Sequence, residues 1–355
     1  MAKKWSCALL AAIALLLAVW AGAVYVIDPY LHYHEPWLGL EAQRTDDSRY
    51  ENYGLAKYLD YDAVMLGTSV TQDAKASEFN SLFDANALRV KFAGSYFKEL
   101  GDFLKYTYDH HEGEIEQVFW VLDITHVLTA ADTMGHSDNP DYLYDDNFWN
   151  DSKYLLNKDV APDLVRSLFN VSPIDFDHQV WADPTGWETL IKVYGPNRPE
   201  QQPEKEFSDE MRAQVMENYE TNVLSIAREH PETHFYFVFP PGNSFFWDYV
   251  SRSGEYTCYM DGMETVMREM LTLPNVTVYN FVDDPDKTMD LGRFKDRVHF
   301  DPAMMSEIIA DVAAGDGQIT DENIDARMDG IRAYWQRVDF DALYEGYNET
   351  EEQAK

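Results

Sequence analysis

Ser69 has a sequence context typical of a nucleophile. It follows an apolar run over residues 64–66 and closes the tripeptide Gly67-Thr68-Ser69. A serine at a turn from a strand to a helix exposes its hydroxyl at the carboxyl edge of a sheet, and its own N–H points to where an oxyanion would form. Gly67 lets the chain turn tightly there. Ser69 is therefore a candidate nucleophile for acyl chemistry, with a helix cap or an ordinary turn as the alternative.

A second motif, Asp296-Arg297-Val298-His299, lies towards the other end of the chain. A serine hydroxyl needs a neutral imidazole as its general base, and that imidazole needs a carboxylate on its other nitrogen to fix its tautomer and orientation. Asp296 and His299 supply both groups within one turn. A surface ion pair or a loop pair is the alternative. The position of the motif, directly before the last helix of the predicted domain, favours a triad with Ser69.

The elements that must position these residues follow from the pattern of hydrophobicity. Short apolar runs alternate with longer amphipathic segments, which is typical of βαβ units and a parallel sheet. The predicted strands are Ala63–Leu66, Leu88–Phe92, Val118–Leu122, His234–Phe239 and Val276–Phe281. The predicted helices are Tyr96–His110, Glu210–Glu229, Gly262–Leu273 and Pro302–Ala314. We expect a three-layer α/β domain over residues 61–314 with a parallel sheet of about five strands.

Three segments fall outside this alternation. Residues 130–206 are rich in Asp, Asn, Pro, Tyr and Trp, which predicts an insertion at the carboxyl edge of the sheet. Residues 28–60 are predicted to be a connecting segment packed on the domain, and residues 315–355 a helix with an acidic tail. Several aromatic residues are candidates for a wall that stacks on sugar rings, or for ordinary buried aromatics: Trp181, Trp187, Phe245, Phe246 and Trp247.

A serine in the first block and Asp-x-x-His in the last resemble the SGNH/GDSL hydrolase superfamily. Residues 28–36, 142–145 and 154–157 are similar to segments of its membrane-anchored branch of D-alanyl-lipoteichoic-acid and polysaccharide O-acetyltransferases. The resemblance extends over residues 25–315, and only the Ser and Asp-x-x-His blocks are specific. It implies an SGNH-like, flavodoxin-like fold. It also implies an oxyanion hole formed by the N–H groups of Ser69 and of Gly94, which follows the second predicted strand.

The sequence departs from this family in one block. Many members carry Gly-x-Asn-Asp after the third strand, where the Asn side chain completes the oxyanion hole, but Leu122-Asp123-Ile124-Thr125 stands here. An ionised Asp123 would repel an oxyanion, so we interpret it as a substrate or structural contact. Asn243, after the fourth predicted strand, could donate its amide to a substrate or could form a turn.

The N-terminus predicts export. Lys3 and Lys4 precede a nearly uninterrupted apolar run from Trp5 to Ile27, which is long enough to cross a hydrocarbon core of about 30 Å. The lysines before the run orient the N-terminus to the cytoplasm and the following domain outside. We expect a retained single-pass anchor over residues 1–27. A signal peptide cleaved near Ala21-Gly22-Ala23, which would release a secreted protein, is the alternative.

Composition excludes several classes of protein. With 28 Lys+Arg and 63 Asp+Glu, the net charge is -35, which argues against nucleic acid as a partner. The 45% of hydrophobic residues exclude a disordered chain, and two cysteines exclude a disulfide scaffold. The pairs His32 and His34, and His110 and His111, lack the partner spacing of a zinc site, so no metal is expected.

These observations predict an extracytoplasmic serine acyltransferase in which Ser69 attacks, His299 takes its proton and Asp296 orients His299. The family resemblance and the anchor favour O-acetylation of a cell-envelope polysaccharide or teichoic acid. The expected partners are that glycan and a membrane-embedded protein that passes acyl groups across the bilayer, and no cofactor is required. The alternatives are a carbohydrate esterase or deacetylase with the same triad, and a catalytically silent envelope-assembly protein.

Overall fold

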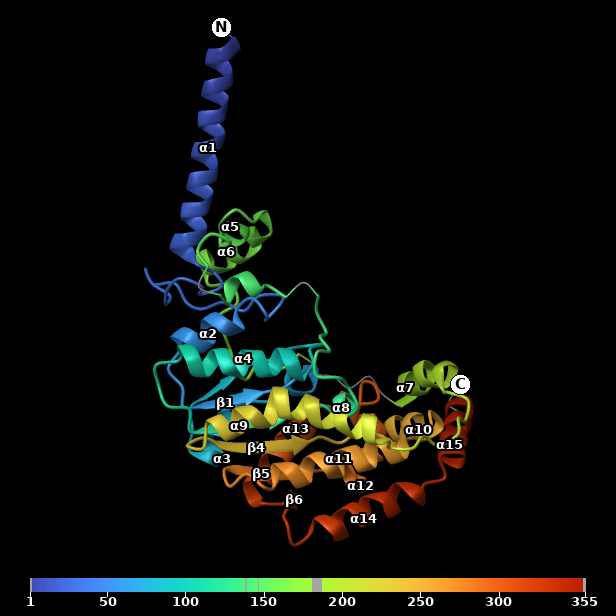
Figure 1. The fold of residues 1–355 in the computed structure, drawn as a ribbon. Coiled ribbons are helices and arrows are strands. Elements are labelled where there is room, and N and C mark those ends of the chain that lie inside the picture. The colour runs from blue at the N-terminus through green and yellow to red at the C-terminus, as the bar shows by residue number, and fades with distance from the viewer. Residues whose placement is uncertain (1, 138, 146, 181–186, 354–355) are drawn as a thin grey trace. The chain divides into compact units, whose positions relative to one another are not determined.

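The chain forms two compact units in a computed structural model that describes residues 2–137, 139–145, 147–180 and 187–353 (Figure 1). Unit 1 comprises Met1–Asp60, Tyr106–Gly113 and His136–Asp175. Unit 2 comprises Tyr61–Lys105, Glu114–Gly135 and Phe176–Lys355. The region of the predicted insertion is thus divided between the two units.

Unit 2 is built on a six-stranded sheet in the order β2-β1-β3-β4-β5-β6. Its strands are β1 (Ala63–Leu66), β2 (Ala87–Arg89), β3 (Gln117–Val121), β4 (His234–Phe239), β5 (Val276–Asn280) and β6 (Gln318–Ile319). The first five are parallel, in the order 2-1-3-4-5 of flavodoxin-like folds, and β6 pairs antiparallel with β5. The predicted α/β fold with a parallel sheet of about five strands is confirmed. The hydrophobicity pattern does not predict β6, because a strand of two residues is too short to display a period.

The strand boundaries differ from the predicted ones mainly at β2, where the predicted strand extends three residues beyond the observed end at Arg89. The apolar run continues through Val90 and Phe92, which are buried. Each still donates a backbone hydrogen bond to the chain of β1, Val90 to Met65 and Phe92 to Gly67. The run therefore reflects burial beside β1 rather than a longer strand.

Helices cover both faces of this sheet, as expected for buried parallel strands (Figure 1). They include α3 (Ala76–Phe83), α4 (Phe97–His110), α8 (Asp209–Tyr219), α9 (Ser225–Glu229), α10 (Ser244–Arg252), α11 (Tyr256–Met270) and α13 (Pro302–Ala314). One core cluster joins the side chains of β1, β3 and β4 on one face to α3 and α13. A π-helical turn over Glu220–Leu224 joins α8 to α9, so the predicted helix over 210–229 contains three segments.

The C-terminal part of unit 2 consists of α14 (Ile324–Gln336) and α15 (Phe340–Gln353). Trp335 of α14 is buried, and its ring stacks on Trp247 at 5.3 Å between centroids. Its indole N–H donates to the carbonyl of Val282. These contacts fix α14 on the domain.

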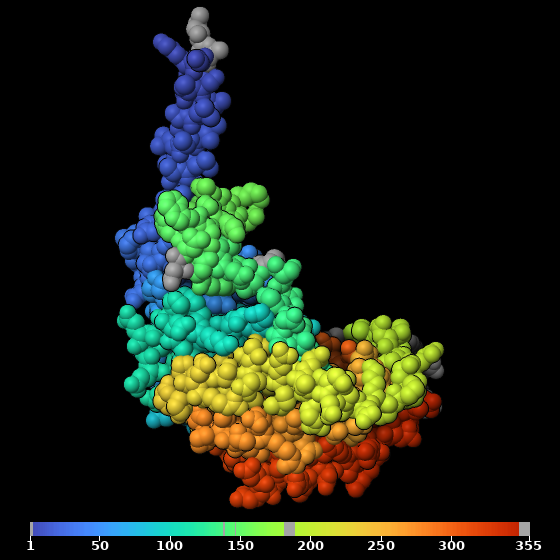
Figure 2. Space-filling view, in the orientation of Figure 1, coloured from blue at the N-terminus to red at the C-terminus, as the bar shows by residue number. Residues whose placement is uncertain are grey.

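Unit 1 begins with α1 (Ala2–Ile27), which is the one helix of the described residues long and apolar enough to cross a membrane. Its side chains are exposed along most of its length (Figure 2). The other elements of unit 1 include α2 (Asn52–Tyr58), α5 (Ser152–Leu155) and α6 (Ala161–Phe169). An exposed apolar N-terminal helix has the features of a signal anchor and equally those of a signal peptide.

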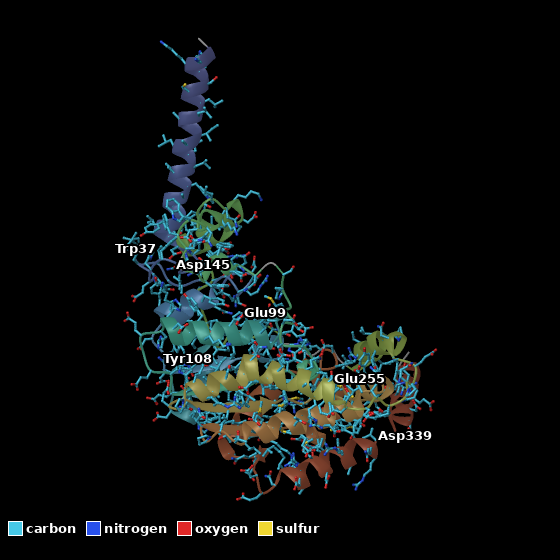
Figure 3. All side chains as sticks on the ribbon, in the orientation of Figure 1. Trp37, Glu99, Tyr108, Asp145, Glu255 and Asp339 are labelled. Atoms are coloured by element: carbon cyan, nitrogen blue, oxygen red, sulfur yellow. The ribbon has the colours of Figure 1, made fainter. Side chains whose placement is uncertain are left out.

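The last turns of α1 pack into a small core within unit 1. Val24 is fully buried with Tyr154 of α5 and Leu164 of α6, and Trp20 and Ile27 pack against them. Trp37 lies beside the C-terminal end of α1 and donates its indole N–H to the carbonyl of Val26 (Figure 3). The end of α1 is therefore part of the folded unit.

Candidate active site

The structure brings Ser69, His299 and Asp296 together in one hydrogen-bonded chain. The Oγ of Ser69 lies 2.6 Å from Nε2 of His299, and Nδ1 of His299 lies 2.6 Å from Oδ2 of Asp296. Ser69 is partly exposed, so its hydroxyl is accessible to a substrate. This is the arrangement of a nucleophile, its general base and the carboxylate that orients that base.

The turn after β1 places the Ser69 hydroxyl. Ser69 begins a 3₁₀ turn over Ser69–Thr71, and the Oγ1 of Thr68 accepts a weak hydrogen bond from the N–H of Val70. A Cβ on Gly67 would lie 2.4 Å from Cγ2 of Thr71, so this position requires glycine because of packing against the turn. The hydroxyl of Thr68 donates to the carboxylate of Asp123 over 2.8 Å, which fixes the turn to the end of β3.

The histidine and aspartate lie in a short closed loop between Phe294 and Phe300, named here the 294–300 loop. These two phenylalanines are buried and form an antiparallel bridge, and the N–H of Lys295 donates to the carbonyl of His299. The Oδ1 of Asp296 accepts from the N–H groups of Val298 and His299, both over 2.9 Å. Asp296 therefore shapes the loop with one oxygen and binds the imidazole with the other.

The charges around His299 favour its protonated form. Burial alone would lower the pKa of His299, but the hydrogen bond and charge of Asp296, with the charges of Asp123 and Asp73, raise it above 6.5. Burial likewise opposes ionisation of Asp296, yet its contact with His299 and the loop N–H groups lowers its pKa below 3.8. The pair is thus arranged to stabilise an imidazolium opposite an ionised carboxylate.

Gly94, the second predicted oxyanion donor, lies in the exposed turn after β2 with φ +75°. This left-handed conformation favours glycine because a side chain would be strained there. Gly135 packs closely against it, since a Cβ on Gly135 would lie 1.7 Å from the carbonyl oxygen of Gly94. The oxyanion role of the Ser69 and Gly94 N–H groups stays a prediction.

Asp123 is almost fully buried, and both of its oxygens bind groups of the protein. Oδ1 accepts from the N–H and the hydroxyl of Thr125, and Oδ2 accepts from Thr68. Burial would raise the pKa of Asp123, but nearby His126 and these hydrogen bonds hold it below 3.8. Asp123 therefore supports the Ser69 turn, and its predicted contact with substrate stays untested.

Asn243 is also buried, at the N-terminus of α10. Its Oδ1 accepts from the N–H groups of Phe245 and Phe246, and its Nδ2 donates to the carbonyl of Asp296 over 2.8 Å. The backbone N–H of Asn243 donates to the carbonyl of Arg297. The side chain thus caps α10 and holds the 294–300 loop, and its predicted contact with substrate stays a prediction.

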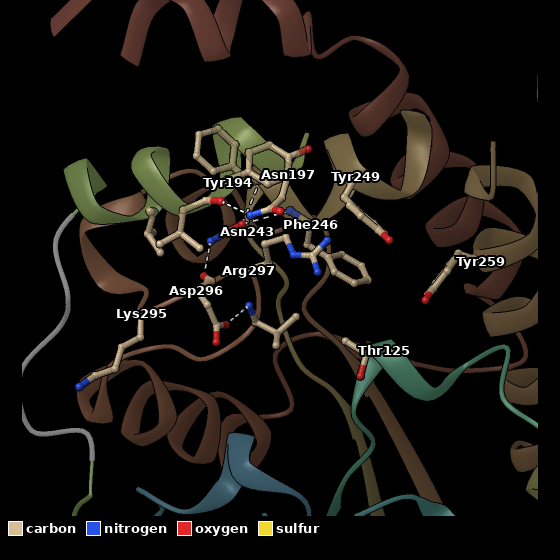
Figure 4. A pocket seen from close by; sticks show the side chains of 14 residues that line it. Thr125, Tyr194, Asn197, Asn243, Phe246, Tyr249, Tyr259, Lys295, Asp296 and Arg297 are labelled. Carbon is tan, nitrogen blue, oxygen red and sulfur yellow. Dashed lines mark hydrogen bonds between the residues drawn. The ribbon is translucent and has the colours of Figure 1, made fainter. Parts of the chain in front are cut away.

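A cavity of about 440 Å³ opens beside the 294–300 loop, at the carboxyl ends of β3 and β4 (Figure 4). Its walls are mostly apolar and aromatic, formed by Leu190, Val193, Tyr194, Phe245, Phe246, Tyr249 and Tyr259. Arg297 extends into it, with its guanidinium 4.0 Å from the ring centroid of Tyr249. No carboxylate forms an ion pair with Arg297 among the described residues, although the chain is strongly acidic. A volume of this size is typical of small-molecule sites.

The aromatic residues proposed for a sugar-stacking wall have different positions. Phe245 and Phe246 line this cavity, whereas Trp247 is fully buried against Trp335 and belongs to the core. Trp181 lies outside the described residues, and Trp187 opens α7 (Trp187–Tyr194). The stacking interpretation is therefore wrong for Trp247, because its ring faces the core.

Sequence reasoning missed the contributions of Thr68 and Arg297. Thr68 occupies the middle of the Gly-x-Ser turn, but its bond to Asp123 joins segments 55 residues apart. Arg297 lies inside the Asp-x-x-His motif, and an arginine between two catalytic candidates in an acidic chain was the available signal. Its stacking on Tyr249 depends on tertiary packing, which one sequence does not display.

Comparison with known proteins gives little further information. No family model matches the chain, and no curated protein matches it. A solved structure described as "a putative platelet activating factor from Streptococcus pneumonia" is similar over 75% of this chain and 91% of its own, at 11% identity and a TM-score of 0.39. The α/β class of the chain follows from its own sheet.

Proposed function

We propose that this protein is a serine acyl-ester enzyme, and that it transfers an acyl group to a cell-envelope glycan outside the cytoplasm. The observation that carries the proposal is the hydrogen-bonded chain from Ser69 through His299 to Asp296. The Ser69 oxygen attacks the acyl carbonyl while His299 takes the hydroxyl proton. His299 then returns that proton to the departing alcohol, which leaves an acyl-serine ester.

A second half-reaction releases the acyl group. An acceptor hydroxyl attacks the acyl-serine ester, His299 takes its proton, and Ser69 leaves as a hydroxyl after regaining that proton. In both halves the negative oxygen of the tetrahedral intermediate is held by the N–H groups of Ser69 and Gly94. Water gives hydrolysis and a sugar hydroxyl gives transfer, so the binding of the acceptor decides the outcome.

The cavity beside the 294–300 loop supports a glycan substrate. Aromatic faces such as Tyr249 and Phe246 suit the apolar faces of sugar rings, and the Arg297 guanidinium suits a carboxylate or phosphate on the same chain. Anionic glycans of the cell envelope, including teichoic acids, carry such groups. Arg297 and Lys295 line the cavity beside Asp296, and within so acidic a protein these two cations favour an anion there.

The N-terminal helix supports tethering at the site of such a glycan. Lys3 and Lys4 lie in the first turn of α1, before its apolar run, and this favours an orientation with the following units outside the cytoplasm. Trp20, which precedes the Ala21-Gly22-Ala23 site and would be lost on cleavage, packs against the small core of unit 1, which favours retention of α1. An acyl donor outside the cytoplasm requires a membrane-embedded partner that supplies it, and we include that partner in the proposal.

Covalent labelling tests the chemistry. Full-length protein in detergent micelles should react with a fluorophosphonate at Ser69, identified by mass spectrometry of the labelled peptide. Ser69→Ala should abolish labelling, whereas Ser77→Ala, an exposed serine of the same unit, should leave it unchanged. Absence of labelling in a folded wild-type protein would favour the catalytically silent alternative.

Product analysis tests transfer against hydrolysis. The full-length protein should hydrolyse a small acetyl ester slowly, and an anionic envelope oligosaccharide should divert the acetyl group onto its hydroxyls. Mass spectrometry of the glycan measures this diversion. An enzyme that never acetylates such glycans but deacetylates them readily is the esterase, with the same triad.

A further inference from the structure

Helix α6 in unit 1 has its hydrophobic pattern reversed. Val165, Leu168 and Phe169 lie on one face, at spacings of three and four residues, and are 52%, 52% and 75% exposed. The opposite face is buried although it carries Asp163 and Ser167. A helix on a soluble domain normally buries its apolar stripe and exposes its polar one. The exposed face of α6 is therefore adapted to a non-aqueous environment.

The buried polar face of α6 is held by a contact from outside the helix as well as by one within it. Asp163 accepts a hydrogen bond from the hydroxyl of Tyr30 over 2.9 Å and forms an ion pair with Arg166 over 2.6 Å. Rotation of α6 to bury Val165, Leu168 and Phe169 would break the Tyr30–Asp163 hydrogen bond and expose Leu164. It would also separate Arg166 from Asp46, with which it forms an ion pair over 2.9 Å. The reversed orientation is fixed by specific interactions.

A second exposed apolar segment directly precedes α5. Phe148 and Trp149 are 65% and 86% exposed, and their rings contact each other at 6.2 Å between centroids. Trp149 is among the most exposed large hydrophobic side chains of the described residues. Tryptophan is enriched where proteins meet the boundary between lipid headgroups and acyl chains.

Both segments adjoin the end of the membrane-spanning candidate. Helices α5 and α6 contact α1, and Trp20 and Val24 of α1 pack in the same small core as Tyr154 and Leu164 (Figure 1). The apolar helix over Lys3–Ile27 has 25 residues and a length of about 37 Å, whereas a hydrocarbon core needs about 30 Å. The last turns of α1, and the segments packed on them, therefore lie at the membrane surface.

We propose that Phe148, Trp149, Val165, Leu168 and Phe169, named here the apolar surface of unit 1, insert into the interface of the bilayer that α1 crosses. Lipid is the occupant because these side chains lie on or next to α5 and α6, and both helices contact the helix that is apolar enough to cross the bilayer. An apolar face at this depth is buried by about 5–10 Å in the headgroup and acyl boundary. The inference goes beyond the acyl chemistry, and it rests on α1 being retained in the membrane.

Fluorescence quenching tests this surface on the full-length protein in phosphatidylcholine vesicles with brominated acyl chains. An environment-sensitive label is attached to Leu168→Cys in a Cys7→Ser background, where the remaining Cys258 is buried. Leu82→Cys in the same background is the matched control, because Leu82 of unit 2 is 49% exposed. A label on native Cys7, which is exposed on α1, reports insertion of α1 separately.

The proposal expects loss of most of the fluorescence at Cys7 and at Leu168→Cys, and little loss at Leu82→Cys. Val165→Cys should repeat the result of Leu168→Cys if substitution at one site disturbs α6. Quenching at Cys7 with an unquenched Leu168→Cys would overturn the proposal, and would mean that a protein partner or water covers this face. An unquenched Cys7 would overturn it as well, because α1 would then lie outside the bilayer. None of these outcomes depends on the activity of Ser69.

Discussion

Each unit contains an aspartate that shapes a loop carrying histidine, and in one of the two loops the histidine ring contacts a serine hydroxyl. In unit 1, Asp28 accepts from the N–H groups of His32, Tyr33 and His34, and from the hydroxyl of Tyr154. In unit 2, Asp296 accepts from the N–H groups of Val298 and His299, and also from the His299 ring. Both carboxylates accept from backbone N–H groups of the loop that follows them, although the spacing is four to six residues for Asp28 and two to three for Asp296.

The difference lies in what surrounds the two carboxylates. Asp28 is fully buried, and burial raises its pKa above 3.8 despite its hydrogen bonds, so it acts as a structural anchor at the end of α1. The side chain of Asp296 is half exposed beside a cavity, and its histidine contacts a serine hydroxyl. An Asp–His motif thus becomes a catalytic candidate only when tertiary structure supplies a nucleophile and access for substrate.

The largest predicted effect separates the two histidines. His299→Ala should reduce hydrolysis of a small acetyl ester by about 10⁴-fold or more, because it removes the general base. His32→Ala should leave kcat unchanged, since His32 lies 3.4 Å from Asp151 in unit 1 and has no role in the triad. Steady-state kinetics of both variants measures the difference. Equal losses in the two variants would contradict the triad.

A second prediction compares the two aspartates. Asp296→Asn should lower kcat by about 10²- to 10⁴-fold with residual activity, because it disturbs the tautomer and charge of His299 and leaves the base present. Asp28→Asn should instead lower the free energy of unfolding by about 1–3 kcal/mol, because an amide nitrogen cannot accept from backbone N–H groups. Steady-state kinetics measures the loss of kcat in Asp296→Asn, and thermal unfolding measures the loss of stability in Asp28→Asn. A loss of activity in folded Asp28→Asn would contradict a purely structural role of Asp28.

The sequence predicted most of the sheet and the members of the candidate triad for the same reason. Ser69 directly follows β1, and Asp296 and His299 lie in the connection from β5 to α13, after α12 (Pro285–Thr288). Parallel strands align their carboxyl ends, so both connections start at the same edge of the sheet. The small core of unit 1 was not predictable, because Val24, Tyr154 and Leu164 come from segments without a common period. The bond from Thr68 to Asp123 and the cavity around Arg297 also depend on tertiary packing alone.

Arg297 provides a prediction of intermediate size. Arg297→Gln should raise KM for an anionic acyl acceptor by about tenfold, since a charge-assisted hydrogen bond contributes about 1.5–3 kcal/mol. KM for a neutral ester should change little. Arg337→Gln, which removes the same charge from an exposed position after α14, is the matched control. Equal effects on anionic and neutral substrates would show that Arg297 acts only through packing on Tyr249.

Two hydroxyl deletions extend the comparison to smaller effects. Thr68→Val removes the donor to buried Asp123, and Tyr154→Phe removes the donor to buried Asp28. Both should lower the free energy of unfolding by about 1–3 kcal/mol, because each leaves a buried carboxylate oxygen with one donor fewer. Only Thr68→Val should also lower kcat, by about threefold to tenfold, because it loosens the turn that positions Ser69. Equal kcat values for Thr68→Val and wild type would show that η1 (Ser69–Thr71) holds Ser69 without Asp123.

The smallest predicted effect is a shift of the pH profile. Because His299 must be neutral to accept the Ser69 proton, kcat/KM should rise with pH through the folded-state pKa of His299, which Asp296 holds above 6.5. Asp296→Asn removes the charge that stabilises the imidazolium, so its residual activity should rise at lower pH than that of the wild type. Asp28→Asn should leave the midpoint in place.

The raised pKa of His299 also makes the free energy of unfolding depend on pH. With Asp296 ionised, its contact with His299 contributes fully below the unfolded pKa of histidine, near 6.5, and this contribution is lost as pH rises through the higher folded value. At the acid end it is lost as pH falls through the pKa of Asp296, which lies below 3.8. The pH dependence of kcat/KM in the wild type, Asp296→Asn and Asp28→Asn measures the midpoints of the activity profiles. A midpoint that stays in place in Asp296→Asn would mean that another group controls the profile.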